Sequence, residues 1–226
     1  MNMSGVGRAE RTDRRTPRGA VAIVLLSVVM AACAGGGDPD RITYRDAQNR
    51  SLFELPNDWN LYRADELVQA GPVPFLPNTG GNIVSYVAFD GAAGRNLGNL
   101  ITGAAGAPYP LGAQIIRQIS ADEKNLLSNL FMAESAYATY NSNLGLQILQ
   151  LDEDPEFDRD YDGIRGYLGV TQGDSDLQGV IYVRAGHNPD GTELYSMAVG
   201  CSLECFTRER QEIEQAVNSW VINTRR

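Results

Sequence analysis

The amino-acid sequence predicts an α+β domain with a mostly antiparallel central sheet and helices packed on its faces. Short runs rich in β-branched and aromatic residues recur along the chain, separated by turn signals. A helix start with a capping residue stands mid-chain, and an amphipathic segment closes the chain. Because the strands do not alternate regularly with helices, neighbouring strands are expected to pair antiparallel, with the helices packed against the sheet.

The first half of the chain contributes four expected strands and two helical segments. Pro56 ends the second strand, and residues 64–70 form a short helical turn. Ser120 and Glu123 match a capping box, so a helix is expected behind them. Residues 91–112 are rich in Gly, Ala and Pro and predict a long connection, which is either mobile or functional. The strands are expected at 42–44, 51–55, 82–89 and 114–119, and the apolar face of the helix at Leu126, Leu127, Leu130 and Phe131.

The second half is rich in strands and ends in a helix. A turn at 187–191 separates the last two strands, and Thr207 is expected to cap the final helix. The strands are expected at 144–151, 166–171, 180–184 and 194–200, and the buried stripe of the helix at Ile213, Ala216, Val217 and Trp220.

The start of the chain matches a secretory signal peptide. An Arg-rich segment at 8–18 precedes an uncharged, mostly apolar run at 19–32. This run is too short to span a bilayer comfortably, since a span needs about 20 residues. We therefore expect a signal peptide at 1–32, a Gly-rich flexible tether at 33–40 and a single α+β domain at 41–226.

The run Val29-Met30-Ala31-Ala32-Cys33 resembles the lipobox of bacterial lipoproteins, with Met30 where Leu is usual. The resemblance implies cleavage before Cys33 and lipidation of its thiol with palmitate-type chains, two or three of which anchor a protein stably. It also implies a domain on the extracytoplasmic side of the cell membrane or the outer membrane. The alternative is an ordinary secreted protein with a chance cysteine at this position.

The charge of the chain argues against two classes of partner. The whole chain carries −9, and the leader contributes +3, so residues 33–226 carry −12. Such an acidic body is unsuited to nucleic acid and to electrostatic binding of anionic lipid. The lipid on Cys33 is therefore the expected contact with the membrane.

With Cys33 committed to lipid, Cys201 and Cys205 are left as a pair. An oxidising compartment favours a disulfide between them, and their spacing suits one if the segment turns or is helical. A reduced, buried pair is the alternative. A metal site is less favoured, because His187 is the only histidine and structural zinc needs four ligands.

An acidic segment at 152–162 holds seven carboxylates against Arg159. Within it, Asp158, Asp160 and Asp162 match the first half of a calcium loop, where carboxylates at alternate positions converge on a hard cation. The twelfth position is Gly169, where such a loop has Glu. A solvated acidic loop is therefore favoured over a calcium site.

Two further features are candidates for function. His187 is the one imidazole available to a hydrolase, but it lies in a turn signal, and the chain has no Gly-x-Ser-x-Gly motif. Phe75 and Leu76 stand between prolines, where apolar side chains lose little entropy on binding. The alternative for Phe75 and Leu76 is a loop folded over the core.

The chain also resembles the PsbP-like fold, a compact sheet with helices on its faces. The resemblance rests on Phe53-Glu54-Leu55-Pro56-Asn57-Asp58-Trp59 near the start, and on the strand 194–199 followed by the closing helix 213–220. It covers most of residues 41–224, and the long segment 90–135 departs from a minimal version of the fold. The resemblance implies an accessory or binding protein without catalytic residues.

Three functional hypotheses follow. The first is a non-catalytic envelope lipoprotein, not an enzyme and without a cofactor, that binds a protein partner or a small ligand. The second is a calcium-binding module that uses the acidic loop 152–162. The third is a hydrolase dependent on His187.

Overall fold

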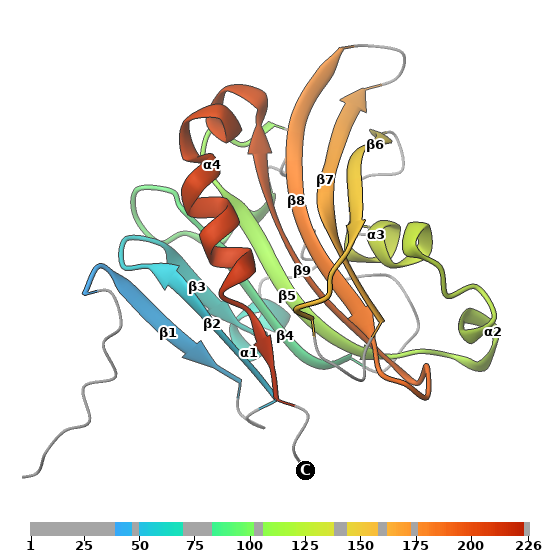
Figure 1. Cartoon of the computed structure of the whole chain (residues 1–226). Helices are drawn as coiled ribbons and strands as arrows, with labels where there is room; N and C mark the ends of the chain where they lie inside the picture. Colours follow the sequence, from blue (N-terminus) through green and yellow to red (C-terminus); the bar gives the residue numbers. More distant parts are fainter. Residues whose placement is uncertain are drawn as a thin grey trace, which may run out of the picture. The chain divides into compact units, whose positions relative to one another are not determined.

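A seven-stranded antiparallel sheet organises the protein, with the strand order β3-β4-β5-β9-β8-β7-β6 (Figure 1). Each strand alternates its side chains between two faces, and buried residues occur on both. Its strands are β3 (Asn60–Arg63), β4 (Ile83–Asp90), β5 (Leu111–Gln118), β6 (Leu144–Glu153), β7 (Asp162–Gln172), β8 (Leu177–His187) and β9 (Glu193–Ser202).

The computed structural model describes residues 39–46, 50–69, 83–101, 106–137, 144–157, 162–172 and 176–223. Residues Asp38–Arg226 form one compact unit. Among the described residues, no helix has the length and apolar character needed to cross a bilayer.

A small sheet and the last helix cover one face of the large sheet. The small sheet has the order β1-β2-β10, with β1 at Arg41–Arg45, β2 at Ser51–Pro56 and β10 at Val221–Ile222. The helix is α4 (Leu203–Asn218). Phe53 of β2 packs on Phe89 of β4, and the Tyr182 hydroxyl of β8 donates to Asn218 of α4.

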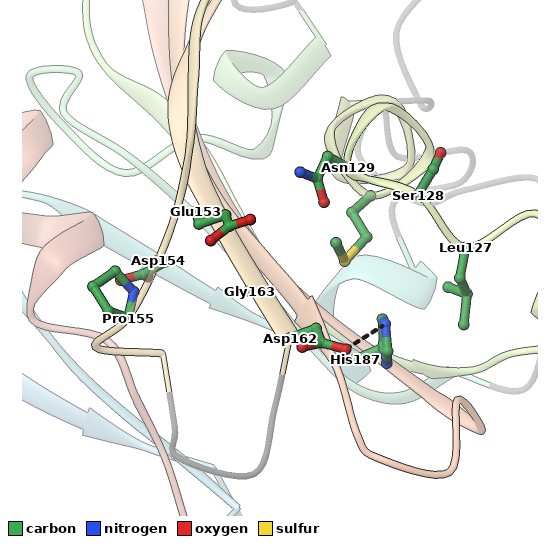
Figure 2. A pocket seen from close by; sticks show the side chains of 10 residues that line it. Leu127, Ser128, Asn129, Glu153, Asp154, Pro155, Asp162, Gly163 and His187 are labelled. Atoms are coloured by element: carbon green, nitrogen blue, oxygen red, sulfur yellow. Dashed lines mark ion pairs between the residues drawn. The ribbon is translucent and has the colours of Figure 1, made fainter.

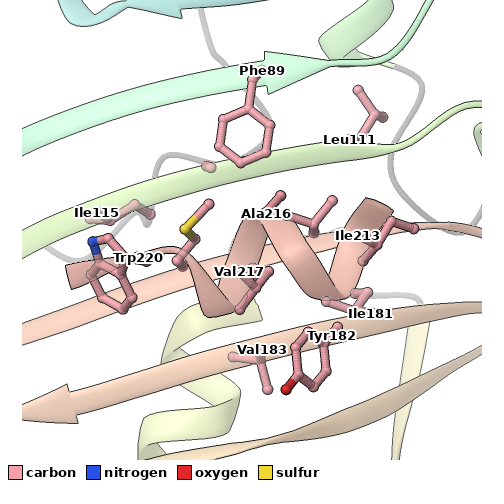
Figure 3. Packing of buried hydrophobic residues seen from close by; sticks show 14 of the residues in the cluster. Phe89, Leu111, Ile115, Ile181, Tyr182, Val183, Ile213, Ala216, Val217 and Trp220 are labelled. Carbon is pink, nitrogen blue, oxygen red and sulfur yellow. The ribbon is translucent and has the colours of Figure 1, made fainter. Parts of the chain in front are cut away.

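One part of the hydrophobic core lies between α4 and the large sheet, and the same cluster continues on the opposite face at Met132 and Ala133. Figure 3 shows Ile213, Ala216 and Val217 of α4 packed against side chains of the sheet. Trp220, just beyond the helix, is buried in the same cluster. The predicted buried stripe of this helix is therefore observed at all four positions.

Shorter helices occupy the rest of the described chain. α3 (Asn129–Tyr137) contacts β7, β8 and β9. Tyr182 of β8 faces α4. The alternating positions 181, 183, 185 and 187 therefore point to the other face of the sheet. On that face His187 lines a pocket together with Met132 of α3. The remaining helices are α1 (Ala64–Gln69), the 3-10 helix η1 (Leu97–Ile101) and α2 (Ala121–Lys124).

The final helix begins earlier than the sequence indicates. It starts at Leu203, and Ser202 is the N-cap, with its hydroxyl accepting from the Cys205 N–H. Thr207 lies inside the helix, where its hydroxyl donates to the Leu203 carbonyl. The prediction of Thr207 as the cap is wrong because Ser202, directly after β9, already satisfies a free backbone N–H.

The mid-chain helix buries a different face from the one that the sequence predicts. The capping box at Ser120 and Glu123 is present, but α2 ends at Lys124 and a new helix starts at Asn129. The break changes the helical phase, so Leu126 and Leu130 are 61% and 48% exposed. Met132 and Ala133 are buried instead.

Cys201 and Cys205 are joined by a disulfide at the junction of β9 and α4, with their Cα atoms 5.8 Å apart. Both side chains are buried. One turn of helix brings the two positions together, so the bridge pins the start of α4 to the strand before it.

Candidate functional site

A pocket of about 710 Å³ lies between the α2–α3 segment and one end of the large sheet (Figure 2). One wall consists of the end of β6, the start of β7 and the end of β8. The other wall is the segment that enters α3. The described lining residues are Leu127, Ser128, Asn129, Met132, Glu153, Asp154, Pro155, Asp162, Gly163 and His187. We call this pocket the α3 cleft.

Strand register brings the polar residues of the sheet wall together. Asp162 pairs with His187 across β7 and β8, and Glu153 pairs with Ile164 across β6 and β7. The Asp162 carboxylate is 3.8 Å from His187 Nε2. The Asp162 side chain is 87% exposed and that of His187 is 15% exposed. A solvated carboxylate therefore stands beside a largely buried imidazole.

Both nitrogens of the His187 ring have a neighbour. Nδ1 is 2.8 Å from the Asn188 carbonyl, so it carries a proton and donates to that oxygen. Nε2 then faces Asp162. The Asn188 side chain accepts from the backbone N–H groups of Thr192 and Glu193, which holds the turn after β8. The orientation of His187 is thus set by the turn that the sequence predicts.

Asp154 is turned away from the cleft into the protein. Its carboxylate is buried, forms a close ion pair with Arg184 and lies 3.9 Å from Arg165. Arg184 also donates to the Trp220 carbonyl. Phe157, which follows, is buried edge-on to Trp220. A fully solvated acidic loop is therefore the wrong interpretation at Asp154, because buried Arg184 compensates its charge.

Two carboxylates remain for the cleft. Glu153 and Asp162 point toward the space between the sheet and α3, and Asn129 stands opposite Glu153 (Figure 2). Neither lysine nor arginine is among the described lining residues. The cleft is therefore acidic on the sheet side.

The helical side of the cleft combines apolar side chains with the polar Ser128 and Asn129. Leu127 and Met132 line it, and the exposed Leu126 and Leu130 lie in the same segment of chain. The Ser128 hydroxyl accepts from the Phe131 N–H and so begins α3. Within the described chain, Ser128 makes no hydrogen bond to His187, and Figure 2 places its hydroxyl away from the imidazole.

Several predicted site residues lie outside the described residues. They are Cys33, the loop residues Phe75 and Leu76, and Asp158 and Asp160 of the calcium half-motif. Asp162, the third member of that half-motif, lines the cleft. Within the described part of the chain, no group of three or more acidic, His or Cys side chains is placed to hold a metal ion. The calcium site stays a prediction.

A second pocket of about 470 Å³ has a different chemistry. Arg45, Arg63, Asp65 and Tyr86 are among its lining residues, and neither arginine forms an ion pair with a described residue. Burial raises the pKa of Tyr86, which keeps its hydroxyl protonated. None of the residues singled out in the sequence lies here. The α3 cleft is therefore the stronger candidate, since it brings together His187 and the acidic segment, which the sequence marks as separate features.

Comparison with known proteins identifies the fold. No protein-family model matches the chain, and no curated protein matches it. The solution structure of cyanobacterial PsbP (CyanoP) from Synechocystis sp. PCC 6803 matches with a TM-score of 0.53 at 14% identity, over 86% of this chain and 99% of that one. The fold is PsbP-like.

The PsbP-like fold that the sequence predicts is thus confirmed, with two antiparallel sheets rather than one. The crystal structure of the Saccharomyces cerevisiae Ran-binding protein Mog1p matches more weakly, with a TM-score of 0.48 at 10% identity, over 80% of this chain and 95% of that one. At these identities the likeness concerns the fold alone. The chemistry of the site has to be argued from this chain's own residues.

Proposed function

We propose that the protein is a membrane-anchored cell-envelope lipoprotein whose PsbP-like domain is a non-catalytic binding or accessory module. The observation that carries the proposal is the α3 cleft, with carboxylates on one wall and the apolar Leu127 and Met132 among the side chains of the other. A polar group that fixes orientation beside an apolar surface is the ordinary construction of a binding site.

The cleft suits a partner group with a positive charge at the end of an apolar stem. Glu153 and Asp162 supply negative charge, and Leu127 and Met132 supply apolar contact. A lysine or arginine side chain of a partner protein has this character, because its methylene stem packs on apolar surface while its charged end group stays in contact with polar groups or water. We therefore expect a basic segment of an envelope protein to bind here.

A hydrolase is less well supported by the same residues. Catalysis by Ser128 and His187 requires a ring nitrogen within hydrogen-bond reach of the hydroxyl. Here Nδ1 donates to the Asn188 carbonyl and Nε2 faces Asp162. Neither nitrogen is directed to Ser128, so the imidazole is placed to recognise a ligand rather than to activate a nucleophile.

The binding proposal is tested by photo-crosslinking in intact envelopes. A photoreactive residue in place of exposed Asn129 should capture a partner that the same residue in place of exposed Gln211, on α4, does not. Replacing both cleft carboxylates, by Glu153→Gln with Asp162→Asn, should lower the yield at Asn129 about fivefold or more, because two charge contacts are lost. Added salt should lower it too. Equal capture at both positions, or a yield indifferent to the carboxylates, would contradict the proposal.

The anchor is tested separately by fractionating cells. Cys33→Ser removes the thiol that would carry lipid, so the protein should leave the membrane fraction. Met30→Leu, which restores the usual lipobox residue, should stay with the membranes. Unchanged membrane retention of the Cys33→Ser variant would refute the lipid anchor and leave the cleft proposal intact.

A further inference from the structure

The strand β6 leaves one edge of the large sheet open in the described structure. It is last in the strand order and pairs with β7 alone among the described strands. It runs for 10 residues, and positions 145–150 are all exposed. Its outer row of backbone N–H and C=O groups is a template for another strand.

The side chains along this edge are apolar. Residues 144–151 carry no charge, and Ile148 and Leu149 are 45% and 43% exposed. Ile148 pairs with Leu168 on one face, whereas Leu149 lies over Gly169 on the other. Both faces of the edge therefore offer apolar surface to a neighbouring strand.

The other sheet edges are protected in ways that β6 is not. β3 is only four residues long and ends in Arg63. β1 has five residues and carries a charge at each end, Arg41 and Arg45. Short strands and charged side chains are the usual means of preventing edge pairing. β6 has a bulge between Ile148 and Gln150, which twists the strand but adds no charge.

We propose that β6 pairs antiparallel with β6 of a second copy of this chain. Asp152 and Glu153 lie at one end of β6 only, and the other end is uncharged. Antiparallel pairing sets each acidic end beside the uncharged start of its partner. Parallel pairing would place Asp152 of each copy about 4.8 Å from the other, which like charges disfavour. The charge pattern of β6 therefore favours antiparallel over parallel pairing with a second β6. Antiparallel pairing is the self-complementary arrangement that a two-fold interface requires.

The pairing has a geometric consequence. It joins the two large sheets into one continuous sheet. Glu153 ends β6 and lines the α3 cleft, so the two clefts lie at opposite ends of the paired strands. Each cleft stays open to a partner, and this inference does not depend on the proposed function.

Cysteine crosslinking of the full chain in its own envelope tests the pairing. Leu149→Cys should give a disulfide-linked dimer under mild oxidation, because it places a thiol near the two-fold axis. Leu126→Cys is the matched control, since Leu126 is an exposed leucine between α2 and α3, outside β6. The unsubstituted chain gives the background of the assay, because Cys201 and Cys205 are bonded to each other and a lipidated Cys33 has no free thiol.

A charge at the edge should abolish the crosslink. Adding Ile148→Lys, or Gln147→Lys at another exposed position, to Leu149→Cys should lower the dimer yield at least about tenfold. Circular dichroism checks that both variants fold. Equal dimer yields from Leu149→Cys and Leu126→Cys would overturn the proposal. So would a yield that neither lysine lowers in a folded protein, or capture of a different protein by Leu149→Cys.

Discussion

Arg184→Met is expected to lower the free energy of unfolding by about 3–5 kcal/mol. Arg184 and Asp154 form an ion pair in which neither side chain is appreciably exposed. Methionine keeps much of the length of the side chain but removes its charge, so the Asp154 carboxylate is left in the interior without its cation. A buried charge without a partner is among the costliest defects in a folded protein.

Urea denaturation of the wild-type protein and its variants measures this loss. Arg165→Met is the matched control, because Arg165 is 37% exposed and lies 3.9 Å from the same carboxylate. It should cost less than about 1 kcal/mol. The double variant Arg184→Met with Asp154→Leu should recover most of the stability, since no charge is then stranded. Equal losses of unfolding free energy in the Arg165 and Arg184 variants would show that the ion pair of Arg184 and Asp154 does not stabilise the loop that holds Asp154.

Trp220→Ala is expected to cost a similar amount, about 3–5 kcal/mol. Trp220 is 1% exposed and is the largest of the fully buried side chains. Its ring meets the edge of Phe157 at a centroid distance of 5.7 Å. Alanine leaves a cavity between the end of α4 and the loop that follows β6, and the surrounding structure can fill it only in part.

Two comparisons isolate the contribution of packing at Trp220. The indole N–H has no hydrogen-bond partner among the described residues, so Trp220→Phe should cost less than Trp220→Ala. Val221→Ala, at an exposed neighbouring position, should change stability by about 0.5 kcal/mol or less. Thermal unfolding followed by circular dichroism gives both values. A larger effect at Val221 than at Trp220 would contradict this account of the core.

The losses of stability from Arg184→Met and Trp220→Ala should not be additive. Arg184 donates to the Trp220 carbonyl, and its guanidinium lies over the Phe157 ring that Trp220 contacts. Residues that share partners in this way show coupling energies of about 0.5–3 kcal/mol. The cost of the double variant should therefore differ from the sum of the single costs.

The elements with a regular pattern could be predicted from the sequence. The alternating apolar runs indicate the longer strands, and the 3.6-residue period of 213–220 indicates which face of α4 is buried. β3 and β10 are not recognisable, because four and two residues are too few to show a period. The face of α3 could not be predicted either, since the break after Lys124 changes the phase of the helix.

The candidate site could be predicted only in part. His187 and the acidic segment are visible in the sequence as separate features. That they meet depends on the register of β6, β7 and β8, and on α3 lying over their ends. The burial of Asp154 depends on Arg184, 30 residues away in the sequence. Such pairings between distant positions leave no local pattern, so Leu127, Asn129 and Met132 give no sign of their role.

The closing of the small sheet has a consequence for how the chain matures. β10 pairs with β2, and Ser219 accepts a hydrogen bond from Glu54, which lies 165 residues earlier. In the export that we propose, with the N-terminus leading, β1 and β2 would cross the membrane long before their third strand. On that route the hairpin of β1 and β2 would lack β10 until almost the whole domain has crossed. If the proposed export is correct, this interval is when we expect a chaperone outside the membrane to bind the chain.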